Sequence, residues 1–145
     1  DIDVSVLVRM ENGSKGTIRS TQIATGLENN LNISVAGSKG SLIWEQENPN
    51  YLYHHTSDKP LQVLKPGHFY NSKLSLDGTK LPAGHPEGIF DAMGNIYRGV
   101  ARAIRDEKIE NGEFPTIDEG VRGMEFIEKA VKSDKNGNTW MELDS

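Results

Sequence analysis

Hydrophobic periodicity changes once along this chain of 145 residues, and that change limits the folds open to it. In Ile2–Met10 every second side chain is apolar, which is the period of a strand with one buried face. From Pro86 onward, apolar residues recur at intervals of three and four, which is the period of an amphipathic helix. Because strands come first and helices follow, we predict an α+β fold with helices packed on one face of an antiparallel sheet.

Strands are predicted wherever apolar or β-branched residues alternate between clusters of turn-forming residues. Gly37–Gly40 and Ser57–Pro60 are two such clusters. A last run of residues, near the end of the chain, is predicted to return to the sheet. The predicted strands are Ile2–Met10, Gly16–Thr25, the run containing Leu31, Ile33 and Val35, Ser41–Gln46, Tyr51–Thr56, Leu61–Leu64 and Asn138–Leu143.

Two helices are predicted in the second half. The first begins near Pro86, which suits the first helical position, and its apolar stripe should pack on the sheet. The second begins at Thr116, which has the spacing of a capping box with Glu119, and ends at Asn136 and Gly137. The first stripe comprises Ile89, Met93, Ile96, Tyr97, Val100 and Ile104, and the second comprises Ile117, Val121, Met124, Ile127 and Val131.

The segment Pro66–Glu87 has no sustained period of either kind. A connection of about twenty residues without regular structure is uncommon in a compact domain unless it acts as a lid or a binding loop. We therefore expect the most informative functional residues to lie in or beside residues 66–87.

Composition excludes several classes of function. The chain has 16 Lys and Arg against 21 Asp and Glu, which gives a net charge of −5, and it lacks the basic patch that a phosphate backbone or an anionic membrane requires. No run approaches the roughly 18 apolar residues of a membrane span. With no cysteine, the chain has no disulfide, thiolate nucleophile or Cys-ligated zinc site, and we expect a soluble, cytoplasmic protein without nucleic-acid or membrane partners.

The four histidines are the first candidates for polar chemistry. His54 and His55 are adjacent on a predicted strand, so their side chains should point to opposite faces and cannot hold one metal ion together. His68 begins the long loop and is compatible with a purely structural role. His85 directly precedes a helix start, where free N–H groups favour oxygen-rich ligands, although it could equally be a residue that only flanks the helix.

The second predicted strand offers another candidate set, because polar residues occupy both of its faces. Arg19 and Thr21 lie on one face, while Ser20 and Gln22 lie on the other. Such a strand can be a solvated edge of the sheet. Alternatively, one face forms the floor of a ligand pocket, where the Gln22 amide can both donate to and accept from hydroxyl groups.

Motifs for a self-contained catalytic site are missing from the sequence. It has no Gly-x-Gly-x-x-Gly after a strand, no P-loop, no His-Glu-x-x-His and no Gly-x-Ser-x-Gly. No pair of carboxylates stands in an apolar surrounding that would separate their pKa values. The residues by themselves therefore predict an α+β domain with one informative loop and no catalytic group.

Five segments, in this order and spacing, resemble the C-terminal domain of the Gfo/Idh/MocA oxidoreductases, which are relatives of glucose-fructose oxidoreductase and inositol dehydrogenase. The resemblance covers nearly the whole chain and implies an open, largely antiparallel sheet. The matching segments are Thr17–Ala24, Glu28–Ile33, Gly37–Leu42, Leu81–Gly88, and Phe114–Thr116 continuing through Gly120–Gly123.

The resemblance implies that residues 1–145 form one substrate and oligomerisation domain, with residues 66–87 on the substrate side. It implies a parent enzyme that oxidises a sugar, polyol or related secondary alcohol with NAD or NADP bound to its own N-terminal Rossmann domain. The family's Glu-Lys-Pro lysine and its Asp-x-x-x-His helix would precede Asp1, so no catalytic residue, cofactor site or metal site is expected here. His85 would contact the substrate, with Gln22 and Arg19 as further candidates, and the sheet face would form a homo-oligomer.

A second hypothesis comes from a different functional class. The same fold could serve as a stand-alone carbohydrate-binding or protein-interaction module without redox activity, because fold alone does not determine function. The chain enters a predicted strand directly at Asp1, as a domain taken from a longer protein would, and this favours the dehydrogenase hypothesis.

Overall fold

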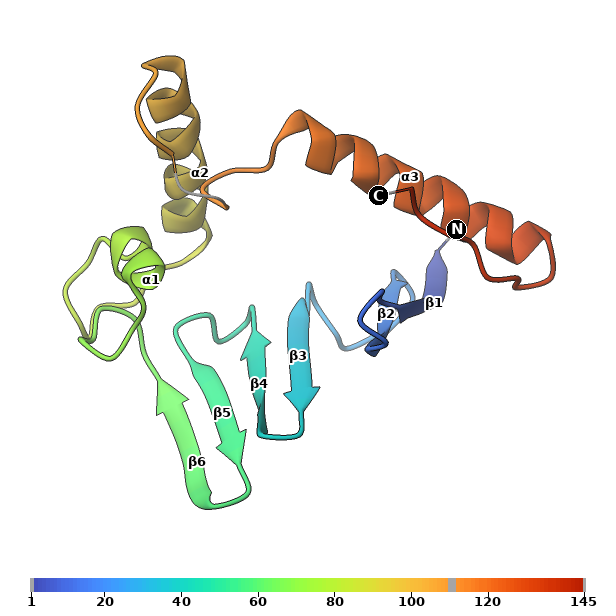
Figure 1. Ribbon diagram of the computed structural model, residues 1–145. Helices are drawn as coiled ribbons and strands as arrows, with labels where there is room; N and C mark the ends of the chain where they lie inside the picture. The colour runs from blue at the N-terminus through green and yellow to red at the C-terminus, as the bar shows by residue number, and fades with distance from the viewer. Residues whose placement is uncertain (1, 110–111, 145) are drawn as a thin grey trace. The chain divides into compact units, whose positions relative to one another are not determined.

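The computed structural model describes residues 2–109 and 112–144 of the chain. They fall into two compact units, and we treat each by itself. Unit 1 combines Asp1–Gly26 with Pro115–Ser145, and unit 2 is Leu27–Phe114. Figure 1 labels the elements of both units.

Unit 1 begins with a β-hairpin. Strands β1 (Asp3–Arg9) and β2 (Lys15–Thr21) pair antiparallel, from Asp3 opposite Thr21 to Arg9 opposite Lys15. The connecting turn is closed by the Met10 N–H, which donates to the Ser14 carbonyl at 2.8 Å. The alternation that predicted the first strand is therefore confirmed, because it places the valines of β1 on one face of the hairpin.

Helix α3 (Ile117–Lys135) belongs to the same unit and starts with the predicted capping box. The Thr116 N–H donates to Glu119 Oε2 at 2.7 Å, and the Glu119 N–H donates to Thr116 Oγ1 at 3.3 Å. These contacts lower the pKa of Glu119, chiefly through the backbone N–H of Thr116 and then through its hydroxyl. The helix ends at Asn136, as its sequence predicts.

The prediction of a last strand over Asn138–Leu143 is wrong. The structure has no strand there, because side chains of α3 take up the backbone polar groups of this segment. Ser133 Oγ donates to the Thr139 carbonyl at 2.7 Å, and Lys129 Nζ donates to the Glu142 carbonyl at 2.8 Å. The segment also contacts the hairpin, since the Arg9 guanidinium lies 4.9 Å from the centre of the Trp140 ring.

Unit 2 contains a four-stranded antiparallel meander: β3 (Asn32–Gly37), β4 (Gly40–Glu45), β5 (Leu52–Thr56) and β6 (Lys59–Leu64). The two open antiparallel sheets and three helices of the described residues confirm the α+β class. In unit 2 the helices lie beyond one end of the strands (Figure 1), whereas we expected them on one face of the sheet.

The long connection after β6 contains a helix that the sequence pattern did not predict. Helix α1 (Lys73–Gly78) has Ser72 as its N-cap, whose hydroxyl accepts from the Ser75 N–H at 3.3 Å. A helix of 6 residues is too short for its hydrophobic period to be recognised. Our expectation that residues 66–87 lack regular structure is therefore wrong for this part.

Helix α2 (Ile89–Ile104) begins three residues after the predicted start, with Gly88 at its N-cap. The Gly88 N–H donates to Asp91 Oδ2 at 2.8 Å. Near the other end, Arg102 Nη1 donates to both carboxylate oxygens of Glu113 at 2.8 Å. A Cβ on Gly99 would lie 2.9 Å from Phe114 Cδ1, so this glycine allows the segment at Glu113 to pack directly on the helix.

Apolar side chains remain open to solvent in both units. In the described part of the chain no hydrophobic residue is buried. The stripe of α2 predicted to pack on the sheet is between 36% and 78% exposed. Among the described residues neither unit closes a hydrophobic core, and apolar faces of this extent are unusual on a protein that has no partner.

Candidate functional site

The Leu81–Pro86 turn, which carries His85, is closed at its base by Glu87. One carboxylate oxygen of Glu87, Oε1, accepts from the Lys80 N–H at 2.5 Å and from the Leu81 N–H at 2.6 Å. Backbone N–H groups that bind a carboxylate form strong, charge-assisted hydrogen bonds. The Glu87 side chain, which follows the turn, therefore fixes the backbone at Lys80 and Leu81, where the turn begins.

Asn50 attaches this closed turn to the sheet. Its Nδ2 donates to the Glu87 carbonyl at 2.8 Å, and its Oδ1 accepts from the Glu87 N–H at 2.9 Å. Asn50 lies in the connection between β4 and β5, which is itself braced where Trp44 Nε1 donates to the Pro49 carbonyl at 3.0 Å. Two hydrogen bonds, one to the N–H and one to the carbonyl of the same residue, hold Glu87 against this connection.

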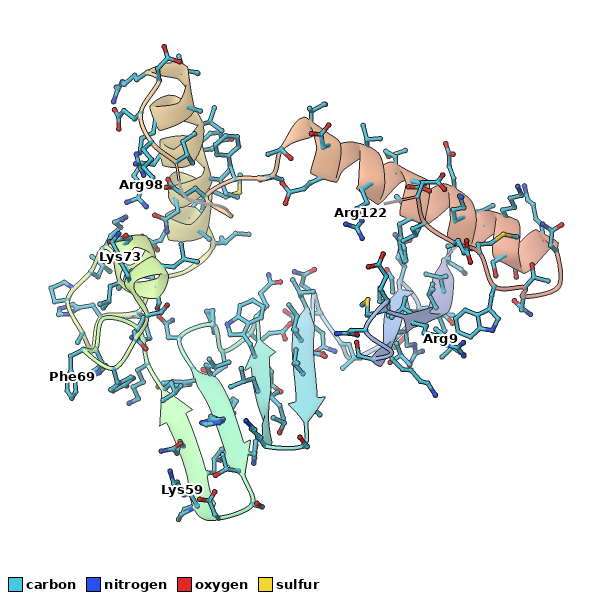
Figure 2. The ribbon with its side chains drawn as sticks, in the orientation of Figure 1. Arg9, Lys59, Phe69, Lys73, Arg98 and Arg122 are labelled. Carbon is cyan, nitrogen blue, oxygen red and sulfur yellow. The ribbon has the colours of Figure 1, made fainter. Side chains whose placement is uncertain are left out.

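Helices α1 and α2 hold the residues before the turn. Asn95 Nδ2 donates to the Gly78 carbonyl at 2.6 Å, and Arg98 Nη2 donates to the Asp77 carbonyl at 3.1 Å, with Arg98 and Lys73 visible in Figure 2. The hydrogen bond from Lys73 is the main cause that lowers the pKa of Asp77, and the charges of Lys73, Lys80 and Arg98 act in the same direction.

The start of the long loop lies against the same turn. Gly67 has a φ of +76°, and a Cβ there would come within 3.1 Å of the Ala83 nitrogen. His68 and Tyr70 stack with ring centres 5.1 Å apart. Phe69, between them, is 93% exposed and points outward (Figure 2). The structure therefore brings His68 near the His85 turn through backbone packing.

His85 itself is fixed within a β-turn. The Pro82 carbonyl accepts from the His85 N–H at 3.1 Å, and Gly84 has the positive φ of +90° that the third position of a type II turn needs. The same carbonyl lies 3.1 Å from His85 Nδ1. Because a carbonyl oxygen can only accept, this contact requires the proton on Nδ1 and leaves Nε2 as the acceptor of the neutral ring.

The other predicted site residues belong to unit 1. Arg19 pairs across the hairpin with Ser5, and its Nε lies 3.7 Å from Asp3 Oδ1 with 66% of the side chain exposed. Gln22 follows β2, where its N–H donates to the Ile2 carbonyl at 2.8 Å and its side chain is exposed. Arg19 and Gln22 thus both belong to unit 1, whereas His85 belongs to unit 2.

The remaining histidines do not form a metal site. His54 pairs with Leu42 and His55 with Ser41, so the two occupy opposite faces of the sheet, as predicted. His54 Nδ1 instead lies 3.1 Å from Gln62 Oε1. Within residues 2–109 and 112–144, no three His, Asp or Glu side chains are close enough to hold a metal ion. Over the same residues no helix has the length and apolar character needed to cross a membrane.

Sequence reasoning did not identify the contact between Asn50 and Glu87. Asn50 and Glu87 are 37 residues apart, and an asparagine in a polar turn carries no local sign of such a partner. Multiple sequences in which both positions change together would be the signal that identifies the pair.

Comparison with known proteins places the chain in a family. Residues 3–143 match the oxidoreductase family, C-terminal alpha/beta domain (Gfo/Idh/MocA). The uncharacterized oxidoreductase YfiI of Bacillus subtilis is 36% identical over an alignment of 144 positions, and the alignment covers 95% of this chain and 37% of that protein.

Two solved structures support the same assignment. An oxidoreductase from Sinorhizobium meliloti has a TM-score of 0.90 at 34% identity, covering 98% of this chain and 41% of its own. An inositol dehydrogenase homolog from Azotobacter vinelandii, complexed with NADH and myo-inositol, has a TM-score of 0.79 at 30% identity, covering 97% of this chain and 38% of its own. This chain thus spans about two fifths of these relatives. It belongs to the Gfo/Idh/MocA oxidoreductase family and corresponds to the C-terminal alpha/beta domain.

Proposed function

We propose that residues 1–145 are the substrate and oligomerisation domain of a cytoplasmic dehydrogenase that oxidises a secondary alcohol of a sugar or polyol with NAD or NADP. The observation that carries this proposal is the similarity to the inositol dehydrogenase homolog with bound NADH and myo-inositol, at 30% identity over 97% of the chain. Residues 66–87 form the substrate-side loop of this domain.

The nicotinamide nucleotide belongs to the protein's own N-terminal domain in this proposal. The described strands pair antiparallel throughout, and none leads through a glycine-rich turn into a helix as a dinucleotide site requires. When bound, the cofactor supplies the hydride acceptor. The present residues neither hold the cofactor nor move the hydroxyl proton, and the 145-residue chain is inactive alone.

His85 is the proposed contact of a substrate hydroxyl, and Gln22 and Arg19 are further candidates, each considered within its own unit. With Nδ1 donating to the Pro82 carbonyl, His85 can accept at Nε2, the Gln22 amide donates and accepts, and the Arg19 guanidinium donates. A polyol with a hydroxyl in the wrong place leaves a polar group unmatched, which costs on the order of 1–3 kcal/mol when buried. Such contacts select among sugars.

An exposed apolar face on the sheet of unit 2 supports the proposal of a homo-oligomer. Ile33, Val35 and Leu42 share one face by strand register and are 56%, 62% and 41% exposed. A second copy covering this face would remove their apolar surface from water. Light scattering of the full-length protein should find a multimer that Val35→Glu converts to smaller species, and a monomeric wild type would contradict this part.

The decisive experiment uses the full-length protein with NAD⁺ or NADP⁺ and a panel of polyols and sugars that includes myo-inositol. We expect substrate-dependent appearance of the reduced nicotinamide. If calorimetry detects sugar binding while no panel member reduces either nucleotide, the redox proposal fails and a carbohydrate-binding module becomes the better account.

A further inference from the structure

Glu87 is the point at which two sets of restraints on the His85 turn meet. Asn50 fixes its backbone through bonds of 2.8 and 2.9 Å, and its carboxylate fixes the N–H groups of Lys80 and Leu81. The turn between these anchors contains two prolines, whose ring-locked φ angles limit its internal motion. If either anchor is lost, the turn is free to move and the geometry at His85 changes with it.

The ring of His85 depends on this geometry for its tautomer. The contact of 3.1 Å between Nδ1 and the Pro82 carbonyl requires that the turn keep its shape. The tautomer of a neutral histidine is set by the hydrogen bond that one of its nitrogens makes. With Nδ1 donating to Pro82, Nε2 presents a lone pair, which can accept a hydrogen bond from a hydroxyl but cannot donate one.

We propose that Asn50 and Glu87 are positioning residues, which hold the Leu81–Pro86 turn so that His85 presents an unprotonated Nε2 to a substrate hydroxyl. The part that concerns the substrate rests on the proposed function. The part that concerns the tautomer is independent of it. Neither residue contacts the substrate in this proposal, and both act through His85.

The test compares five forms of the full-length protein labelled with ¹⁵N-histidine. Asn50→Asp keeps the acceptor for the Glu87 N–H and removes the donor to its carbonyl, while Glu87→Ala removes the carboxylate. Glu87→Gln is the conservative variant, because its amide oxygen can still accept both N–H groups. Asn48→Asp is the matched control: Asn48 lies in the same connection, but its Nδ2 donates to the Tyr53 hydroxyl at 3.1 Å.

Long-range ¹H–¹⁵N spectra at a pH where the ring is neutral report the tautomer directly. We expect His85 to be protonated at Nδ1 in the wild type, Glu87→Gln and Asn48→Asp, and to shift toward the Nε2-protonated form in Asn50→Asp and Glu87→Ala. With a polyol that the enzyme oxidises, the last two should raise KM about tenfold with kcat changed little.

An Nε2-protonated wild type would overturn the proposal, as would Nδ1 protonation that persists in both Asn50→Asp and Glu87→Ala. Unfolding of both variants, followed by circular dichroism, would make these residues structural and also contradict it. If the spectra agree with expectation and no polyol is oxidised, positioning of the ring stands and the proposed function fails. If a polyol is oxidised and the spectra disagree, the reverse holds.

Discussion

The Leu81–Pro86 turn and helix α2, which follows it, differ in what holds them in place. The turn is fixed by short polar contacts from Asn50 and Glu87, all within unit 2. The apolar stripe of α2 is not covered by the described residues of the same unit and remains between 36% and 78% exposed. Directional hydrogen bonds therefore define the geometry of the candidate site locally, whereas the burial that would stabilise the helix has to come from outside the unit.

The largest effect on stability is expected from a polar substitution in the apolar stripe of α2. In the full-length protein Ile96→Ser should lower the free energy of unfolding by roughly 3 kcal/mol, because we expect the stripe to be covered there. Arg105→Ser, at the exposed C-cap of α2, should change it by less than about 0.5 kcal/mol. Denaturant titration measures both, and equal effects would mean that the stripe stays exposed in the whole protein.

Two glycines of α2 sharpen the comparison, because only one of them contacts another segment. Gly99→Ala should destabilise the protein by roughly 1–3 kcal/mol, since the new Cβ would lie 2.9 Å from Phe114 Cδ1 and 3.1 Å from the Glu113 carbonyl oxygen. Gly94 has no atom within 4 Å of such a Cβ, so Gly94→Ala should stabilise the helix by about 1 kcal/mol. Thermal melts that move in the same direction for both would refute this packing.

The sequence correctly predicted those elements whose signal lies within the element itself. The alternation of β1 and the capping box of Thr116 with Glu119 both appear in the structure where the sequence indicates them. Helix α1 was not predicted, because it is too short to show a hydrophobic period. The segment at Asn138 was wrongly predicted as a strand, because its hydrogen-bond partners are side chains of α3. The hydrogen bonds of Asn50 to Glu87 could not be predicted, since no local rule relates residues 37 positions apart.

The smallest effect concerns an exposed polar contact in unit 1. The pKa of Glu119 is held below its ordinary value of 4.5, so its ionised form is favoured in the folded state. This contribution is complete above the unfolded pKa and is lost as the pH falls through the lowered folded pKa. Urea titrations of wild type and Glu119→Gln should therefore differ slightly at neutral pH and converge in acid, and a difference that grows in acid would contradict the cap.

The most direct test of the central claim is the steady-state kinetics of the full-length protein and its His85→Ala variant on the best polyol of the panel. We predict that kcat/KM of the variant falls at least about tenfold, mainly through KM, while the dissociation constant for the reduced nicotinamide nucleotide stays the same. Equal kcat/KM values for the two proteins would remove His85, and the turn built around it, from the substrate site.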